Sequence, residues 1–510
     1  MKKMLFEELK KYGEGDFYPF HMPGHKRNPD SGPLSEIYRC DITEIDGFDN
    51  LHQAEGILKD AQERAASLYH SKETFFLVNG STSGILTAIS AVASRGRKMI
   101  IARNCHKAVY HGVFLNRLEA EYIYPKVIDE FGISDGITAD QIENKIQDVI
   151  FKEGVTGDKA ADLIAGVIIT SPTYDGILSD VRGIVKVAHS FGIPVIVDQA
   201  HGAHFGFHPG FPESAVTEGA DLVIHSVHKT LPAPTQTALL HCNSLLVNME
   251  AVKKYLRIYQ SSSPSYLLMA GIDACMELVK EEGADRLEQL LAYREELAGK
   301  AKKLKKIRIY PSMLERKRSG QDVSRFFESG MEEPGRLLIS VKGTGMTGQQ
   351  IYDVLREKYH LQMEMSASDY VIAILSMMDT KEGFDRLWKA LWEMDQLAED
   401  RKDGVKKAEN TKLTGYCQYH PRKILEISDA FITKNELVLL DESDERIAAE
   451  FVNLYPPGIP IVVPGERIDN RIIQMIKAYL DNGYTVQGVE RDREDEGYYL
   501  PVVREEKNDQ

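Results

Sequence analysis

The sequence predicts an α/β protein whose largest part is a mainly parallel, doubly wound sheet. Apolar runs such as residues 163–170 (LIAGVIIT) and 194–198 (PVIVD) are short and rich in β-branched residues, which is typical of strands buried on both faces of a parallel sheet. Between such runs, as far as about residue 245, lie longer stretches with apolar residues at helical spacing. Strands that alternate with helices in this way predict βαβ units.

The predicted elements of the large domain follow one another along residues 54–305. The first helix begins near residue 54, since apolar residues then fall on one helical face: Ile57, Leu58, Ala61, Ala65 and Leu68. Further helices are predicted over residues 85–94, 106–118, 138–151 and 180–191, with a polar loop at residues 152–161. Further strands are predicted over residues 74–79, 98–102, 121–125, 220–224 and 236–242. From residue 247 the domain is predicted to be mostly helical, with a break at residues 261–265 (SSSPS).

The rest of the chain is predicted to form an arm and two smaller units. Residues 1–53 contain segments broken by Pro and Gly and are predicted to be an extended N-terminal arm. Residues 306–399 combine two helices with short strands at 337–341 and 370–376, as in a small α/β domain. Residues 400–410 are charged and nearly without apolar side chains, which predicts a linker before a C-terminal unit at residues 411–510.

Composition narrows the class of protein. The 510-residue chain has a net charge of −15 and a pI near 5.6, which argues against a nucleic acid or an anionic membrane as partner. Its five cysteines are scattered and include no CxxC pair, which predicts a reduced, cytoplasmic protein without a zinc finger. The first residues show no apolar signal-peptide core, and no apolar run approaches the roughly 18 residues that cross a bilayer.

Lys229 is the first candidate functional residue. It follows the predicted strand at residues 220–224, and Pro232 and Pro234 are predicted to exclude a helix directly after it, so the lysine is expected at a bend between two strands. The common alternative is a surface lysine on a hairpin. A lysine held by rigid elements and partly desolvated can instead have the neutral amine that a Schiff-base lysine needs.

Two further candidate groups follow strands earlier in the chain. Ser81, Thr82 and Ser83 stand at a predicted helix start, where hydroxyls, free backbone N–H groups and the helix dipole favour a phosphate. The alternative for these residues is ordinary helix capping. His106 follows the strand at residues 98–102, and its flat ring can stack on a planar cofactor, although a hydrogen-bonded loop histidine is the commoner case.

Asp198 ends the apolar strand at residues 194–198. A carboxylate in this position is costly unless it is paired, and a protonated heteroaromatic nitrogen is a suitable partner, with His201 beside it. A metal site made by Asp198, His201, His204 and His208 is an alternative. The irregular spacing of these residues disfavours it, and no metal is predicted.

Together these groups predict pyridoxal 5′-phosphate as the cofactor. In open α/β sheets, ligands bind at the carboxyl ends of the strands. A phosphate site, a ring-stacking group, an acid for the ring nitrogen and an imine-forming lysine follow one another along the chain, and these are the parts that hold this cofactor. Each signal is weak alone and strong in combination.

The chain resembles the fold type I pyridoxal-phosphate-dependent ornithine/lysine/arginine decarboxylases, in the short bacterial form that lacks an N-terminal regulatory domain. The likeness covers nearly the whole chain and rests on segments such as HMPGHKR, FFLVNGSTSG, VDQAHGAHFGFHP and HSVHKTLPAPTQ. RIAAEFVNLYPPGIPIVVPGE is the most specific segment, because unrelated aminotransferases lack it. The resemblance implies an aspartate aminotransferase-like large domain, a small α/β domain and a C-terminal α+β decarboxylase domain.

The resemblance also implies roles for single residues. Lys229 would bond to the cofactor, Asp198 would pair with its pyridine nitrogen and His106 would stack on its ring, so these three are the predicted catalytic residues. The phosphate would be held by hydroxyl and imidazole groups: Ser81, Thr82, Ser83, Ser226 and His228. The SSSPS segment would reach the cofactor of a neighbouring subunit, which implies a homodimer or a larger homo-oligomer with shared active sites.

Two positions depart from the family pattern. Gln199 stands where many relatives are expected to have an acid, next to the carboxylate predicted to bind the ring. Pro234 stands where leucine is the more usual residue, shortly after the lysine. These departures concern the surroundings of the ring and the entrance for the substrate.

The predicted function is the decarboxylation of a basic amino acid to the corresponding di- or polyamine and CO2, with arginine ahead of lysine and ornithine. The alternatives are another fold type I activity (aminotransferase, lyase or aldolase), a non-catalytic protein with this fold, and a histidine-rich metal hydrolase. The distal cation of the substrate is predicted to meet an acid of the N-terminal arm or, failing that, of the C-terminal unit: Asp41, Glu44, Asp46, Asp49, Glu442 or Glu466.

Overall fold

The computed structural model describes residues 3–128, 131–310, 331–400, 419–454, 458–492 and 497–505. The predicted linker at residues 400–410 therefore lies outside the described residues, except for Asp400, which ends a helix. Within these ranges no helix has the length and apolar character needed to span a bilayer.

A seven-stranded sheet forms the centre of the large domain, in the order β1–β9–β8–β7–β6–β2–β3. Within this sheet only β9 (Ala238–Cys242) is antiparallel to its neighbours. The other strands point one way: β1 (Glu73–Leu77), β8 (Leu222–His225), β7 (Val195–Asp198), β6 (Ile164–Thr170), β2 (Lys98–Ala102) and β3 (Glu119–Ile123). The prediction of a mainly parallel sheet is confirmed, and the carboxyl ends of these strands share one edge.

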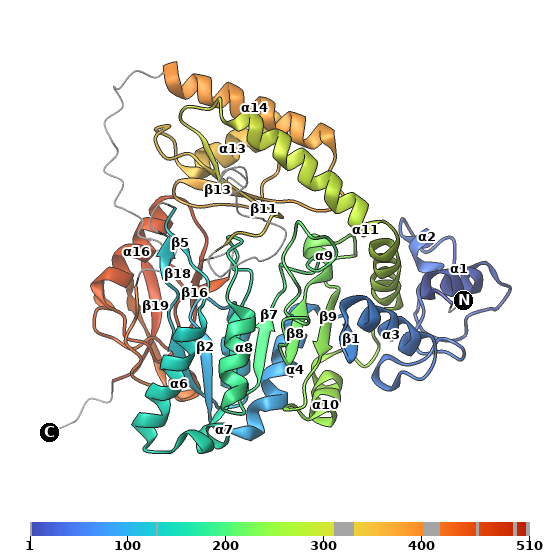
Figure 1. The fold of residues 1–510 in the computed structure, drawn as a ribbon, viewed down its shortest axis with the longest axis horizontal. Coiled ribbons are helices and arrows are strands. Elements are labelled where there is room, and N and C mark those ends of the chain that lie inside the picture. Colours follow the sequence, from blue (N-terminus) through green and yellow to red (C-terminus); the bar gives the residue numbers. More distant parts are fainter. Residues whose placement is uncertain are drawn as a thin grey trace.

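Helices cover both faces of this sheet (Figure 1). Helices α6 (Ala139–Glu153) and α8 (Val181–Ser190) lie on the side turned toward the viewer, and α4 (Gly80–Val92) lies behind the sheet. Helix α4 approaches the strands closely, because a Cβ on Gly84 would lie only 2.7 Å from Leu77 Cδ1. This contact fixes the start of α4 beside the carboxyl end of β1. Other helices of the domain are α3 (Ile57–Tyr69), α5 (Lys107–Leu115) and α10 (Met249–Tyr259), besides those described below.

The segment around the lysine differs from the prediction. Lys229 lies in a one-turn helix, α9 (Val227–Thr230), and not at a bend between strands. The two prolines permit this turn, because proline disrupts a helix that it interrupts, and otherwise only restricts the residue before it to an extended conformation. Leu231, which precedes Pro232, is accordingly extended (φ −125°, ψ 156°) and ends the turn.

The N-terminal arm is not extended throughout. It contains α1 (Leu5–Glu14) and the short α2 (Ser35–Tyr38). Leu5 and Leu9 are fully buried, and the N–H of Leu5 donates to the carboxylate of Asp273 at 2.9 Å. The charged residues around this i, i+4 pair hide its helical pattern in the sequence. The predicted loop at residues 152–161 likewise runs into a short helix, α7 (Ala160–Leu163).

The long helix α11 (Tyr266–Ala301) leads to a second, antiparallel sheet, which lies above the large sheet in Figure 1. Its order is β10 (Arg308–Tyr310), β11 (Arg336–Ser340), β13 (Tyr370–Ile374) and β12 (Met365–Ser366). Helices α13 (Gly348–Tyr359) and α14 (Lys381–Asp400) complete this part, as the predicted small α/β unit requires.

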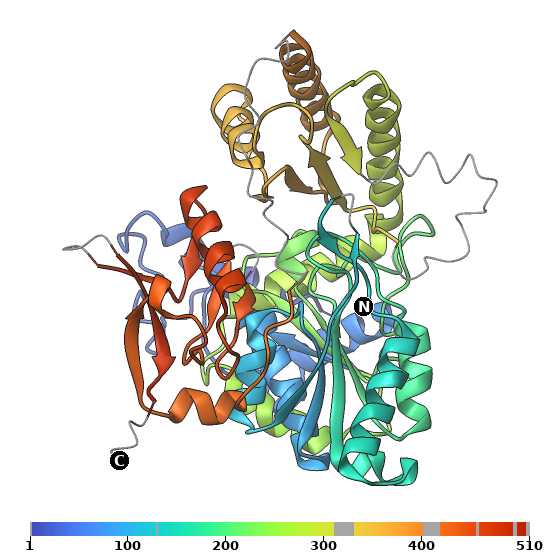
Figure 2. The same cartoon turned by 90° about the vertical axis from the view of Figure 1, so that its left-hand side faces the viewer.

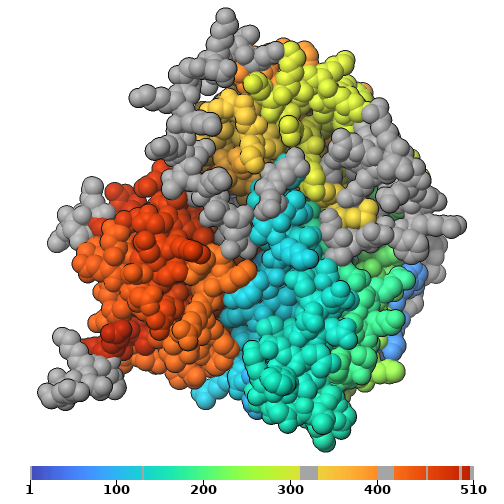
Figure 3. Space-filling model, turned by 60° about the vertical axis from the view of Figure 1, so that its left-hand side comes forward, coloured from blue at the N-terminus to red at the C-terminus, as the bar shows by residue number. Residues whose placement is uncertain are grey.

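Within its described residues, the C-terminal unit consists of two three-stranded antiparallel sheets with two helices. Figure 2 shows it beside the large sheet, and in Figure 3 its surface lies beside that of the large domain. One sheet pairs β14 (Asn435–Leu439), β19 (Tyr498–Val503) and β18 (Glu490–Arg491). The other pairs β16 (Ile459–Val462), β15 (Val452–Leu454) and β17 (Val486–Gln487). The helices are α15 (Ile427–Ile432) and α16 (Asn470–Asp481).

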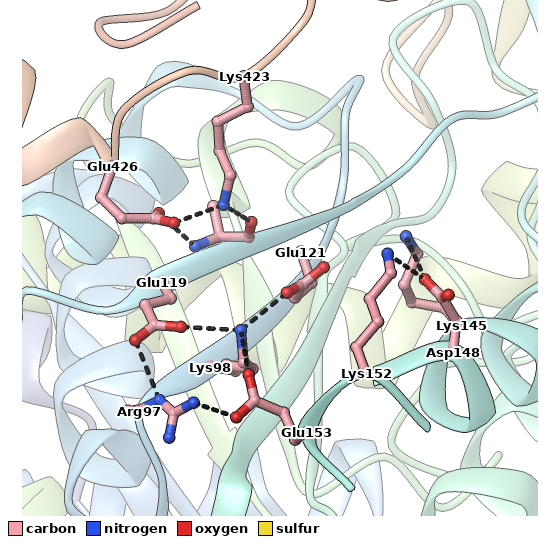
Figure 4. A network of polar contacts seen from close by, with 11 residues as sticks. Arg97, Lys98, Glu119, Glu121, Lys145, Asp148, Lys152, Glu153, Lys423 and Glu426 are labelled. Carbon is pink, nitrogen blue, oxygen red and sulfur yellow. Dashed lines mark hydrogen bonds and ion pairs between the residues drawn. The ribbon is translucent and has the colours of Figure 1, made fainter. Parts of the chain in front are cut away.

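Charged groups join the C-terminal unit to the β2–β3 side of the large sheet. Arg103 and Glu466, both buried, form a two-pronged ion pair with Nη2–Oε2 at 2.9 Å and Nε–Oε1 at 3.2 Å. Lys423 donates to the carbonyl of Ala120 in β3 at 2.7 Å, and Glu426 accepts from the N–H of Ala120 at 3.2 Å (Figure 4). The C-terminal unit thus lies against the carboxyl end of β2 and against the start of β3.

Candidate active site

Lys229 lies directly after β8, at the carboxyl edge of the large sheet. Its Nζ is 2.9 Å from Nε2 of His201. Burial lowers the pKa of Lys229, and the charge of Arg336 lowers it further, although the nearby Asp198 carboxylate acts in the opposite direction. A lowered pKa leaves a larger fraction of the amine neutral, and the neutral amine is the nucleophile.

Asp198 is the last residue of β7, the strand next to β8. Its side chain is buried, and Oδ1 accepts a hydrogen bond from the N–H of Ala200 at 3.1 Å. Burial raises the pKa of Asp198, while the positive charge of Lys229 opposes this effect. The carboxyl group thus lies close enough to the lysine for the two charges to interact.

His106 stands at the start of α5, after the carboxyl end of β2. Its Nδ1 accepts from the N–H of Ala108 at 3.2 Å, so the ring proton of the neutral form is on Nε2. Burial lowers the pKa of His106 to about 4, and the charge of Lys229 contributes to this shift. The ring is therefore neutral at pH 7 and faces the same region as the lysine.

The predicted phosphate residues gather at the start of α4. The side chain of Asn79 does not cap this helix, which leaves backbone N–H groups available for an anion. The hydroxyl of Ser226 donates to that of Ser81 at 3.2 Å, and Thr82 is exposed. Ser83 differs, because its buried hydroxyl donates to the carbonyl of Gly80 at 2.8 Å.

His228 follows Ser226 in the lysine segment. Its Nδ1 donates to the carbonyl of Thr237 at 2.9 Å, a bond that ties α9 to the start of β9. Only Nε2 of this ring is left for another partner. The structure thus brings Lys229, Asp198, His106 and His201 together and places the serines at the neighbouring helix start.

The second sheet and the loop after β6 supply residues that the sequence did not predict. Arg336 begins β11, is 1% exposed, and its Nη2 contacts Nδ1 of His201. The hydroxyl of Tyr174 donates to Glu364 at 2.7 Å, and the Tyr174 ring lies edge-on to His201 at 5.2 Å. The charge of Glu364 acts on Lys229, since it raises the pKa of the lysine. No local pattern links these residues to Lys229, because packing of two sheets brings them together.

The histidines of the alternative metal site have different partners. His204 Nε2 lies 3.2 Å from Glu333 Oε2, and His208 Nε2 lies 2.8 Å from Glu288 Oε2. His201 contacts Lys229 and Arg336 instead. The three rings therefore do not converge on one point.

Two acids suggested for the distal cation are already engaged. The Asp49 carboxylate accepts from the N–H groups of Gly56 at 2.7 Å and Leu58 at 3.1 Å, so it caps the start of α3. Glu466 is paired with Arg103. A carboxylate with these partners is not free to bind a substrate, whereas Asp46 remains exposed.

The departures from the family pattern have structural partners. Gln199 is buried, and its Oε1 accepts from His225 Nε2 at 2.8 Å and from the N–H of Ala215 at 3.0 Å. A neutral amide oxygen satisfies these donors without burying a charge. Pro234 packs on α11, since a Cβ on Gly271 would lie 2.4 Å from Pro234 Cδ.

This arrangement fits pyridoxal phosphate. The uncapped start of α4 beside Ser81 and Ser226 suits a phosphate. The buried Asp198 carboxyl needs a cationic or hydrogen-bonding partner, such as a protonated ring nitrogen. Lys229, with its lowered pKa, suits an aldehyde.

Comparison with known proteins gives matches over nearly the whole chain. Residues 4–382 match the family model "Orn/Lys/Arg decarboxylase, major domain", and residues 420–504 match "Orn/Lys/Arg decarboxylase, C-terminal domain". An arginine decarboxylase of Bacillus subtilis (strain 168) is 32% identical over 99% of this chain and 98% of its own length. An arginine decarboxylase of Halalkalibacterium halodurans is 33% identical over 96% of this chain and 95% of its own.

A solved structure supports the fold. The lysine decarboxylase of Francisella novicida superimposes with a TM-score of 0.81 over 98% of this chain and 81% of that chain, at 21% sequence identity. At this identity the likeness concerns the fold: a large mainly parallel sheet, a smaller sheet and a C-terminal part.

Proposed function

Since the chain belongs to the Orn/Lys/Arg decarboxylase family, we propose that it is a pyridoxal-phosphate-dependent arginine decarboxylase, with lysine and then ornithine as poorer substrates. Decarboxylation of a basic amino acid follows from the family. The preference for arginine is supported by the relatives of Bacillus subtilis and Halalkalibacterium halodurans described above, which are named arginine decarboxylases. The observation that carries the proposal is the position of Lys229 at the carboxyl edge of the large sheet, with its Nζ 2.9 Å from His201 Nε2 and the buried Asp198 at the end of the neighbouring strand.

In this proposal each part of the site has one task. Backbone N–H groups at the start of α4, with Ser81, Thr82 and Ser226, hold the phosphate, and Ser83 contributes through its backbone because its hydroxyl is occupied. Lys229 is the residue that would hold the cofactor through its aldehyde carbon. Bound pyridoxal phosphate supplies an electron sink for the pair left on the α-carbon when CO2 departs.

The chain's own groups maintain the protonation that this chemistry needs. Asp198 stands where it can hold a proton on the ring nitrogen by charge pairing. His106 stays neutral at pH 7, so its face can lie on the ring without adding a cation. His201 holds a ring nitrogen within hydrogen-bonding distance of Lys229 Nζ.

We further propose that Glu364 and Tyr174 bind the distal cation of the substrate, in place of the acids of the N-terminal arm. Glu364 is exposed, accepts from Tyr174 and acts electrostatically on Lys229. A guanidinium can engage a carboxylate by two parallel hydrogen bonds, whereas an ammonium acts as a point charge. This difference supports arginine ahead of lysine.

A homodimer with shared active sites is part of the proposal. Large apolar side chains of the N-terminal arm are exposed, including Phe17 at 69%, Tyr18 at 71% and Phe20 at 90%, and such patches are typical of protein interfaces. The exposed serines at residues 261–263 lie beside the arm, because His52 Nε2 donates to the carbonyl of Ser261 at 2.7 Å.

The state of the cysteine thiols is relevant to the cellular compartment of the protein. Cys40, Cys105, Cys242 and Cys275 are free, which supports the proposal of a reducing, cytoplasmic setting. Decarboxylation of a basic amino acid there would feed polyamine synthesis.

Product analysis tests the proposal. The purified protein is incubated with pyridoxal phosphate and arginine, lysine or ornithine, and the products are identified by mass. We expect CO2 and the amine of each consumed substrate, with kcat/KM highest for arginine. A keto acid, or an unchanged carboxyl group with all three substrates, would refute the proposal.

A further inference from the structure

Arg336 is placed between two domains by contacts on every side of its guanidinium. Its Nη2 contacts Nδ1 of His201, its Nε donates to the carbonyl of Tyr174 at 3.3 Å, and its Nη1 lies 3.5 Å from Glu333 Oε1. Its stem passes Gly176, where φ is +97° and a Cβ would lie 2.7 Å from Arg336 Cγ. Together these contacts hold the guanidinium beside His201.

Glu333 is itself held in place. It is fully buried, its Oε2 lies 3.2 Å from His204 Nε2, and it accepts from the N–H of Gly335. These donors and the charge of Arg336 keep the pKa of Glu333 below its usual value despite burial. A carboxylate at this position keeps Arg336 in its place beside His201.

The donors around His201 determine which of its two ring nitrogens carries the proton. Arginine has only donors, so Nδ1 of His201 must accept, and a neutral ring must carry its proton on Nε2. That nitrogen lies 2.9 Å from Lys229 Nζ. The bond between them therefore runs from His201 Nε2–H to the lone pair of a neutral lysine amine.

The charges around His201 also favour its neutral form. Basic groups face it from several elements: Lys229 and His228 of α9, His106 before α5, and Arg336 of β11. Among the nearby acids, Glu333 pairs with Arg336 and His204, Glu364 accepts from Tyr174, and the charge of Asp198 acts on Lys229. Burial first, and then the charges of Lys229 and Arg336, hold the pKa of His201 well below its usual value.

We infer that Arg336 is a positioning residue that locks His201 in the neutral Nε2–H tautomer, and so makes His201 a proton donor directed at the nitrogen of Lys229. The inference rests on the proposed function only in taking Lys229 as the reactive amine. The lock itself depends on the donor-only guanidinium and on the burial of both side chains.

Nitrogen NMR of histidine-labelled protein tests the lock directly. His201 is identified by the signals that His201→Gln removes, and spectra are taken near pH 7 with and without pyridoxal phosphate. We expect Nε2 protonated and Nδ1 unprotonated in both states, because the contact with Arg336 does not involve the lysine. A protonated Nδ1 in the unaltered protein would overturn the inference, and this outcome does not depend on any variant at position 336 folding.

Two matched variants distinguish control of the His201 tautomer by Arg336 from a merely structural role of Arg336. Arg336→Lys keeps a donor-only cation and is expected to keep the Nε2–H form. Arg336→Gln offers an amide oxygen that can accept from Nδ1–H, so the Nδ1–H form is expected to become populated. An unchanged tautomer in Arg336→Gln would overturn the inference. Failure of product analysis with an Nε2–H signal intact would refute the proposed function and leave the lock standing.

Discussion

His201 Nε2 lies 2.9 Å from Lys229 Nζ, and the other nitrogen of the same ring contacts Arg336. One imidazole therefore connects the lysine after β8 with an arginine of the second sheet. Because both residues beside it are basic, the site favours a neutral imidazole and a neutral amine. This arrangement lies at the carboxyl edge of the large sheet.

Asp198→Asn is expected to keep the fold and most of the bound cofactor, yet to lower kcat by orders of magnitude. The amide cannot hold a proton on the ring nitrogen by charge pairing, so the electron sink is lost. Stability is not expected to fall, because burial disfavours the charged carboxylate in the cofactor-free protein. Steady-state kinetics beside a cofactor titration checks this, and a near-normal kcat would show that another acid fills the role.

Ser81→Ala and Ser226→Ala are each expected to weaken the affinity for pyridoxal phosphate. A hydrogen bond to a charged oxygen is worth ~1.5–3 kcal/mol, or roughly ten- to a hundredfold in Kd. Ser83→Ala is the matched control, since its hydroxyl is bound to Gly80 and is expected to matter less. Fluorescence titration measures Kd, and excess cofactor is expected to restore activity. Equal losses for all three variants would argue against this assignment.

Glu364→Gln is expected to raise KM for arginine by roughly ten- to a hundredfold, the cost of one charge-assisted hydrogen bond, with a smaller change in kcat. Asp49→Asn is the comparison, because Asp49 caps α3. Its loss is expected to lower the thermal unfolding midpoint and to leave KM unchanged, since a cap is worth ~1 kcal/mol. If Asp49→Asn raised KM and Glu364→Gln did not, an acid of the N-terminal arm would be the one that binds the distal cation of the substrate.

His106 links stability to pH. Its pKa in the folded chain is about 4, against ~6.5 when unfolded. Because the pKa is lower in the folded chain, neutral His106 contributes fully to folding stability above pH ~6.5. This contribution is lost as the pH falls toward about 4. Between pH 7 and pH 5 this amounts to about 2 kcal/mol at most. His106→Gln is expected to reduce the fall in the unfolding midpoint of the cofactor-free protein over this range, and an equal fall in both proteins would contradict the assignment.

Local patterns predicted the large sheet and most of the site. Buried parallel strands such as β6 are continuous apolar runs. Asp198 ends such a strand, and Ser81, His106 and Lys229 each come shortly after a strand. Helix α9 differs from the prediction because it is a single turn that ends before Pro232, so neither proline interrupts it.

What the sequence could not reveal depends on packing between sheets. Arg336 and Glu364 stand more than a hundred residues after Lys229, near strands of the second sheet. Nothing in their local sequence marks them as neighbours of the lysine. The cap formed by Asp49 is likewise invisible without the backbone that it contacts, so this acid looked available for the substrate.

The attachment of the cofactor to Lys229 tests the central claim most directly. The protein is loaded with pyridoxal phosphate, reduced with borohydride so that the bond to the lysine becomes permanent, digested, and mapped by mass spectrometry. The account predicts a phosphopyridoxyl group on Lys229, and loss of both this group and the visible absorption band in Lys229→Ala, while the exposed-lysine control Lys186→Ala keeps both. A label on another lysine, or an absorption band and activity that survive in Lys229→Ala, would contradict it.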